Sequence, residues 1–174
     1  MRAFISGKPR MTRLFLTLAT RNLFVNPSYI KRTMSTTTKH MDDDCIFCKI
    51  VRGKVPSKKV AETDKSFAFM DIEPLSSGHV LIIPKYHAKY MHELPDEYLS
   101  DVMPIAKRIA IAADLDQYNV LQNNGKLANQ AVPHVHFHVI PKPNEETGLG
   151  IRWKPMETTP DDITAVYERI LKKL

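Results

Sequence analysis

Short stretches of alternating apolar and polar residues recur along the chain after residue 42, and alternation with period two predicts β-strands. The expected strands are Lys59–Thr63, Ser66–Ile72, His79–Ile83, Tyr118–Gln122 and His134–Ile140. Turn-forming residues separate several of them, as at Asp64-Lys65 and Asn123-Asn124-Gly125. Pro84, which has no backbone N–H, is expected to close the third strand.

Apolar residues at helical spacing predict two main helices and a short one. The first main helix is expected over Asp96–Ala113, where Pro104 either bends it or marks a late start. The second begins at Thr159-Pro160, with Thr as N-cap and Pro at the first helical position. A short helix is expected over Cys45–Arg52. Together these elements predict an α+β fold: an antiparallel sheet of about five strands with helices packed on it.

The excess of positive over negative charge is confined to the N-terminal end of the chain. Of the 25 Lys and Arg residues, eight lie in residues 1–41, which hold no acid, so residues 42–174 carry 17 basic and 19 acidic side chains. That balance gives no electrostatic case for nucleic-acid binding by the folded part. No apolar run is long enough for a transmembrane helix, so we expect no membrane partner either.

Residues 1–41 form a basic N-terminal extension, and residues 42–174 form the expected domain. The extension is rich in Ser and Thr, and its apolar residues could line one side of a helix, which is typical of a mitochondrial presequence. A disordered tail, or translation that starts at Met34 or Met41, explains the same composition. We therefore expect a mitochondrial protein if the extension is used, and a cytoplasmic and nuclear one if translation starts at Met34.

Three histidines carry the strongest chemical signal. His134, His136 and His138 alternate with apolar residues, so on a strand all three imidazoles project from one face. Such a row suits metal ligation or nucleophilic and acid–base chemistry. A zinc site made of all three, or a purely structural row, are the alternatives. The polar loop of residues 123–130 enters this strand and should lie beside the histidines, and His79 opens another strand that could reach the same place.

The only two cysteines, Cys45 and Cys48, have the spacing C-x-x-C. Four interpretations compete: a redox pair, half of a zinc site, a disulfide, or two unconnected thiols. A redox pair would call for a strand before the motif, whereas three aspartates precede it here. Zinc would need two further ligands.

The pattern His-φ-His-φ-His-φ-φ, where φ is apolar, resembles the signature of the histidine triad (HIT) family of nucleotide hydrolases and transferases. The similarity runs from Cys45 to about Trp153 and is strongest to the Hint branch, the adenosine phosphoramidases, in particular to its fungal member. The stretches that carry it are Cys45–Ile50, Phe69–Pro74, Gly78–Lys85 and Gln122–Pro141. The resemblance implies a HIT-like fold whose sheet is extended by homodimerisation, with Gly148–Trp153 of one subunit reaching the site of the other.

The resemblance also assigns roles to residues of this chain. It makes His136 the nucleophile, His138 a phosphate contact, and His134 a residue that orients the nucleophile or serves a metal. Asp71 would bind the ribose, since a carboxylate accepts from both hydroxyls. The remaining nucleotide-binding positions are the purine pocket, the histidine near the site and the phosphate-side loop: Ile46, Phe47, Ile50, Val55, Phe69, Ile72, His79, Asn123, Asn129, Gln130 and Ala131.

Two features of the resemblance concern the loop and a metal. Many Hint proteins have Gly-Gln-Ser before the triad, and the serine can assist the leaving amine, whereas this chain has Asn129-Gln130-Ala131. Some HIT proteins with this C-x-x-C bind one zinc through both cysteines and two histidines, and the matching positions here are Cys45, Cys48, His87 and His134. Such a Cys₂His₂ set is a closed, structural zinc sphere.

The implied function is that of a hydrolase. It would cleave the P–N bond of AMP-amine or AMP-lysine substrates through a covalent nucleotidyl-histidine, with no cofactor required for the chemistry. One alternative is a dinucleoside polyphosphate hydrolase, which the Cys-x-x-Cys start and the segment after the triad resemble less. Another is a zinc-stabilised purine-nucleotide-binding module with weak catalysis, which Ala131 leaves open. The expected partners are an AMP-type nucleotide and a second copy of the chain.

Overall fold

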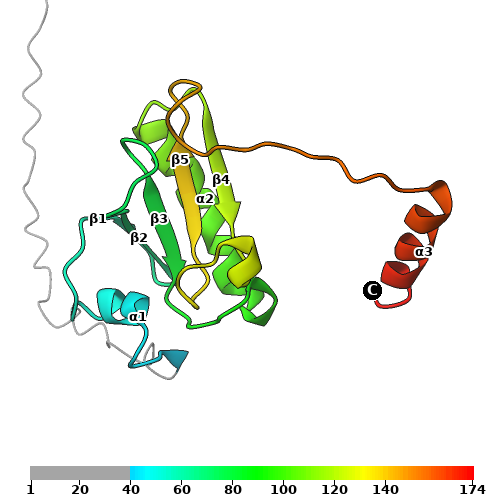
Figure 1. The fold of residues 1–174 in the computed structure, drawn as a ribbon. Helices are drawn as coiled ribbons and strands as arrows, with labels where there is room; N and C mark the ends of the chain where they lie inside the picture. The colour runs from blue at the N-terminus through cyan, green and yellow to red at the C-terminus, as the bar shows by residue number, and fades with distance from the viewer. Residues whose placement is uncertain (1–39) are drawn as a thin grey trace, which may run out of the picture. The chain divides into compact units, whose positions relative to one another are not determined.

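The computed structural model describes residues 40–174. Its five strands form one sheet in the order β1-β2-β3-β5-β4, and every neighbouring pair is antiparallel (Figure 1). The strands are β1 (Lys59–Glu62), β2 (Ser66–Met70), β3 (Val80–Pro84), β4 (Tyr118–Gln122) and β5 (Phe137–Pro141). The predicted five-stranded antiparallel sheet is therefore confirmed. The presequence-like extension and the start at Met34 fall outside the described residues, so they stay predictions.

Helix α2 (Asp96–Ala112) packs against one face of the sheet and builds the main core. Ala68, Val80 and Ile82 point to this face because side chains on a strand alternate. The helix is continuous through Pro104, so a late start at that residue is wrong. The helix covers the apolar residues of three strands, and the core positions of the central strands are almost completely buried.

The opposite face is covered by the short helix α1 (Ile46–Val51). Phe47, Cys48 and Ile50 of this segment form a second apolar cluster with residues of β2 and β3: Phe67, Phe69, Leu81 and Ile83. We call this side of the sheet the α1 face. It is the side that carries the triad, because Val135, Phe137 and Val139 belong to the core on the α2 side and the histidines alternate with them.

The triad strand begins later than predicted. β5 starts at Phe137, not at His134, because its pairing with β3 runs only from Val80↔Val139 to Ile82↔Phe137. Continuing this ladder would bring in Pro84, which has no N–H to donate. Instead, the N–H of Val135 donates to the backbone oxygen of Ala88 at 2.8 Å. Residues 134–136 are thus held by a loop, while the alternation of their side chains is preserved.

Helix α3 (Pro160–Leu171) begins as predicted, and two short 3₁₀ turns complete the elements: η3 (Met91–Glu93) and η4 (Lys126–Ala128). The Thr159 side chain accepts a hydrogen bond from the N–H of Asp162. No residue of α3 is buried, and its apolar residues Ile163, Tyr167 and Ile170 are more than half exposed. In the described part of the chain, no helix is long and apolar enough to cross a membrane.

Candidate active site

His136 lies on the α1 face, and its two ring nitrogens have different environments. Its Nδ1 lies 2.6 Å from the backbone oxygen of His134. A carbonyl oxygen can only accept, so Nδ1 carries the proton and donates it, which leaves a lone pair on Nε2 of the neutral ring. The ring of Phe47 packs edge-on against His136, with centroids 5.2 Å apart. The fold therefore holds His136 in the tautomer that a nucleophile needs.

A chain of hydrogen bonds also fixes the tautomer of His138. The backbone N–H of Leu75 donates to Nδ1 of His79 at 3.2 Å, so His79 carries its proton on Nε2. That N–H faces Nδ1 of His138 at 3.0 Å and donates to it. His138 is left with an N–H at Nε2, a buried atom that has no hydrogen-bond partner in the described part of the chain.

The unpartnered N–H of His138 indicates a ligand-binding function. Buried polar atoms are rarely left without a partner. The rings of His136 and His138 lie 5.0 Å apart, centre to centre, so a lone pair and a hydrogen-bond donor are presented side by side. Attack at phosphorus requires a nucleophile together with a donor for the charge that develops on the phosphoryl oxygens. This pair supplies both.

Burial keeps the imidazoles of this face neutral. It lowers the pKa of His136, and it lowers the pKa of His138 to about 4, with His136 and His79 adding to the effect on His138. Burial likewise lowers the pKa of His79, against the opposing charge of Asp71. The lone pair of His136 is therefore available at neutral pH.

Asp71 lies at the end of β2, beside His79. Its Oδ2 is 3.5 Å from Nδ1 of His79, which is too long for a good hydrogen bond, so Nδ1 of His79 remains the acceptor of the Leu75 N–H. Its Oδ1 accepts from the N–H of Glu73 at 2.9 Å. The carboxylate keeps further acceptor capacity and is only partly buried. It is thus available to a hydroxyl-bearing ligand.

The loop before the triad is held by its own amides. Gln130 donates through Nε2 to the backbone oxygen of Lys89 at 2.6 Å and accepts through Oε1 from the N–H of Gly125 at 2.8 Å. Asn123 donates to the backbone oxygen of Asn129 at 3.3 Å, and Asn129 has a positive φ of 63°. Gln130 therefore has one N–H left for a phosphate, because its other groups hold the loop.

The residues expected to form the purine pocket divide into two groups. Phe47, Ile50 and Phe69 are buried in the apolar cluster of the α1 face, and Val55 packs against it. Ile46 and Ile72 are 41% and 93% exposed. Ile72 directly follows Asp71, so an apolar surface lies next to the carboxylate expected to bind the ribose.

Four potential metal ligands, one of them the first triad histidine, lie close together. The ligand atoms of Cys45, Cys48, His87 and His134 all lie within 4.8 Å of one another. His134 Nδ1 is 3.4 Å from Sγ of Cys45, 3.6 Å from Sγ of Cys48 and 3.2 Å from Nδ1 of His87. A tetrahedral zinc with ordinary bond lengths separates its ligands by ~3.3 Å between two nitrogens and ~3.6 Å between nitrogen and sulfur.

The surroundings of these ligands also suit a metal. His134 donates through Nε2 to the backbone oxygen of Pro84 at 2.9 Å, which turns the Nδ1 lone pair toward the two sulfurs. Asp42 donates its N–H to Sγ of Cys48 at 3.4 Å, and its carboxylate lies 3.8 Å from Nε2 of His87. Burial raises the pKa of the Cys48 thiol to about 11, so a cation is needed to hold it as a thiolate.

The alternatives for the cysteines and for the triad can now be compared. Cys45 and Cys48 are not joined by a disulfide. The clusters of possible ligands found in the described residues separate the triad: His134 joins the cysteines, and His138 joins Asp71 and His79. No such cluster in residues 40–174 contains all three triad histidines, which argues against a zinc site made of them.

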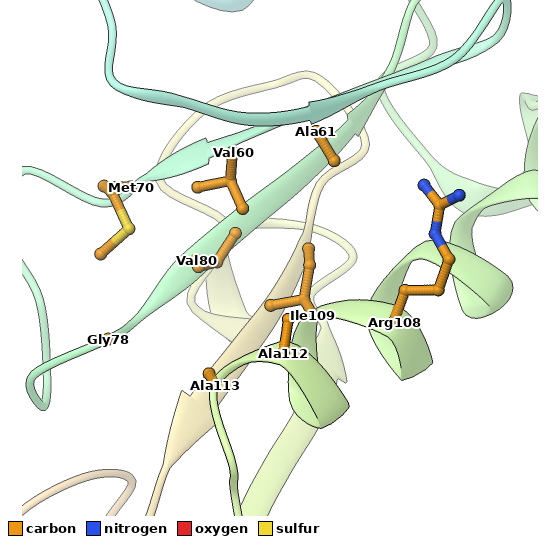
Figure 2. Close-up of a pocket in the computed structure, with 9 residues that line it drawn as sticks. All are labelled: Val60, Ala61, Met70, Gly78, Val80, Arg108, Ile109, Ala112 and Ala113. Carbon is orange, nitrogen blue, oxygen red and sulfur yellow. The ribbon is translucent and has the colours of Figure 1, made fainter.

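A separate apolar cavity of about 320 Å³ lies on the other side of the sheet (Figure 2). Its walls include Val60 and Ala61 of β1, Val80 of β3 and Ile109 of α2. Val80 and Ile109 belong to the core on the α2 side. This cavity therefore faces away from the triad.

The structure adds residues that sequence reasoning missed. The backbone groups of Pro84 and Leu75 set the tautomers of His134 and His79, and Ala88 holds the segment that leads to His136. Backbone groups carry no signal in a sequence. Only Pro84 could have been suspected, since it was expected to end its strand.

Comparisons with known proteins identify the family of the chain. A family model described as the HIT domain matches residues 52–145. Adenosine 5'-monophosphoramidase HNT1 of Saccharomyces cerevisiae is 50% identical over 150 residues, which span 86% of this chain and 95% of the yeast protein. The chain therefore belongs to the histidine triad family.

Solved structures resemble the fold. The histidine triad nucleotide-binding protein from Candida albicans gives a TM-score of 0.72 at 47% identity, covering 74% of this chain and 96% of that one. A zinc-bound histidine triad family protein from Mycobacterium smegmatis gives a TM-score of 0.58 at 36% identity, covering 65% of this chain and 84% of that one.

Proposed function

We propose that this chain is an adenosine 5'-monophosphoramidase, which hydrolyses the P–N bond that joins AMP to an amine. The observation that carries the proposal is the pairing of the Nε2 lone pair of His136 with the unpartnered Nε2–H of His138. The yeast relative of 50% identity bears the name of this activity.

The chemistry follows from the two tautomers. Nε2 of His136 attacks phosphorus and forms a P–N bond to the enzyme, while the bond from phosphorus to the amine breaks. The N–H of His138 donates to a phosphoryl oxygen as charge develops there. The departing amine takes a proton from water, because the methyl group of Ala131 has none to give. Water then attacks the nucleotidyl-histidine, which releases AMP and restores His136.

The nucleoside half of the substrate is assigned to the side of Asp71. Its carboxylate would accept from the ribose hydroxyls, and the exposed side chains of Ile46 and Ile72 would gain cover from a purine ring. Asn123 and the remaining N–H of Gln130 would reach phosphoryl oxygens. The buried members of the apolar cluster, such as Phe47, support this surface from beneath.

The convergent cysteines and histidines suit a single structural zinc. Four of the separations between their ligand atoms are 3.2–3.6 Å, close to those of a tetrahedral Cys₂His₂ sphere, and all four atoms lie within 4.8 Å of one another. The ion would join the start of α1 to the residue whose carbonyl orients His136, and it would leave the triad chemistry to the protein's own imidazoles.

A homodimer would complete the molecule. β4 is the last strand at its edge of the sheet and pairs only with β5 among the described strands. The apolar side of α3 is exposed, and so is Trp153, at 88%. Unpaired strand edges and uncovered apolar faces both favour association, and we propose that a second copy covers them.

The activity is tested with an AMP amide as substrate, following release of AMP by liquid chromatography. His136→Ala should abolish turnover, with a loss of roughly 10⁴-fold or more expected when the nucleophile is removed. His40→Ala is the matched control, because His40 is an exposed histidine stacked on Tyr86. Turnover by His136→Ala comparable to wild type would refute the proposal.

A further inference from the structure

An open cleft lies beside the loop that leads into the triad. Its volume is about 580 Å³, and its wall includes Lys89, Lys126, Gln130 and Ala131. Two of these side chains are lysines, and the described residues that line the cleft include no carboxylate. We call it the lysine cleft.

No acid in residues 40–174 forms a recorded ion pair with either ammonium group of the lysine cleft. Lys126 is exposed, and its side chain makes no hydrogen bond or ion pair that the structure records within residues 40–174. The Nζ of Lys89 lies 4.9 Å from the ring centre of Tyr90, a contact that uses no acceptor. The carboxylate of Glu93 accepts instead from the backbone N–H groups of Lys89 and Tyr90.

Both lysines are fixed to the segment that enters the triad. Gln130 binds the backbone oxygen of Lys89 with its amide nitrogen and the N–H of Gly125 with its amide oxygen. Lys126 directly follows Gly125, and Ala131 directly follows Gln130. The backbones that carry the two lysines are thus clamped together by one side chain, close in sequence to His134.

We propose that the lysine cleft receives the leaving group of the substrate and selects leaving groups with an anionic substituent, with Lys126 and Lys89 as the specificity-determining residues. The inference rests on the proposed function. In that function the nucleoside lies against Asp71, and in-line displacement puts the leaving group on the side of phosphorus opposite His136. A carboxylate in the cleft is attracted by both ammonium groups, whereas a cation is repelled.

A neighbouring cavity carries carboxylates, whose negative charge would favour leaving groups of the opposite sign. It has a volume of about 490 Å³, shares Lys89 and Ala131 with the lysine cleft, and is lined by Asp42 and Asp44 as well. A leaving group seated there would be selected for positive charge. The sign of the preference therefore reports which cavity receives it.

The test uses three AMP phosphoramidates of matched size, whose amines are alanine, alaninamide and propane-1,2-diamine. They place a carboxylate, a neutral amide and an ammonium group at the same position. Values of kcat/KM are measured for wild type, Lys126→Gln, Lys89→Gln and the control Lys58→Gln, whose side chain is exposed and outside the cleft. Comparing each variant with wild type cancels the intrinsic reactivity of each amine.

We expect either cleft substitution to lower kcat/KM for the alanine substrate roughly fivefold relative to the alaninamide substrate. The same substitution should raise kcat/KM for the diamine substrate relative to the alaninamide substrate. Raising the salt from about 0.01 M to about 1 M should compress the wild-type preference. Lys58→Gln should leave the ratios unchanged. Equal ratios in all proteins, or a wild-type preference for the diamine that survives the substitutions, would overturn the inference. Failure of wild type to hydrolyse any of the three would instead refute the proposed function.

Discussion

At the scale of single residues, the site depends on which nitrogen of each imidazole carries the proton. Carbonyl oxygens and backbone N–H groups decide this, because the first can only accept and the second can only donate. His136 is fixed by the carbonyl of His134, and His79 is fixed by the N–H of Leu75. The proposed nucleophile, His136, and the proposed donor, His138, thereby present different groups although both are histidines two residues apart.

The role proposed for His138 predicts a specific loss of activity on substitution. His138→Ala removes the donor to the phosphoryl oxygens and should lower kcat by roughly 10²- to 10³-fold, the usual effect of losing one such donor. His138→Gln, which keeps an N–H, should recover part of the rate. Steady-state kinetics on an AMP amide checks both variants. A kcat for His138→Ala within a few fold of wild type would mean that the unpartnered N–H serves no substrate.

The lowered pKa values predict an unusual pH profile. Attack requires neutral His136, and burial lowers its pKa below the ordinary value of 6.5. His138, with its pKa lowered to about 4, also stays uncharged in mild acid. The acid limb of kcat/KM should therefore lie below pH 6.5 once the uncatalysed rate has been subtracted. A limb centred at or above 6.5 would show that His136 is as solvated as a free imidazole.

At the scale of elements, alternation predicts the bounds of some strands and not of others. Tyr118–Gln122 matches β4 in full, because its polar-apolar pattern reports a half-buried surface. The start of β5 was not predictable, since it depends on the missing N–H of Pro84 in a neighbouring strand and on the carbonyl of Ala88. Pairing partners of this kind are set by tertiary structure.

The candidate site also has features that the sequence predicts and features that it does not. The shared face of the triad follows from its period of two, and the structure agrees. The convergence of Cys45 with His134, 89 positions away, came only from the family resemblance. The engagement of Gln130 with the backbones of Lys89 and Gly125 had no signal in the sequence at all.

The link between α1 and the triad predicts metal-dependent stability. If one zinc joins Cys45, Cys48, His87 and His134, the purified protein should contain about one zinc per chain by elemental analysis. Removing it with a chelator should lower Tm by roughly 10 °C or more, because metal-binding energy is folding energy in such sites. Cys48→Ser should show the low Tm from the start and no further response to chelator. A metal-free wild type with an unchanged Tm would contradict the proposed zinc.

At the scale of the whole molecule, several apolar surfaces have no cover within the described part of one chain. They include the side of α3 that carries Ile163 and Tyr167, and Trp153 in the segment before it. A soluble monomer rarely exposes such surfaces without a partner. The proposed homodimer would cover them.

A homodimer has a direct hydrodynamic signature. Sedimentation equilibrium of the full chain at about 10 μM should give twice the monomer mass of 19.9 kDa. Removing residues 149–174 should weaken the association, since it removes both exposed apolar segments. A wild-type mass of one chain at this concentration would exclude the dimer.

The proposed mechanism requires that His136 becomes covalently bound to AMP during turnover, and intact-mass spectrometry detects such an adduct. Wild type and His136→Ala are mixed with an AMP amide and quenched rapidly, and the mass of each intact protein is measured. The quench avoids acid, because acid would cleave the adduct. We expect a transient mass increase of one AMP group on wild type, mapped to His136, and none on the variant. Substrate consumption without an adduct on wild type, or an adduct of the same size on His136→Ala, would contradict it.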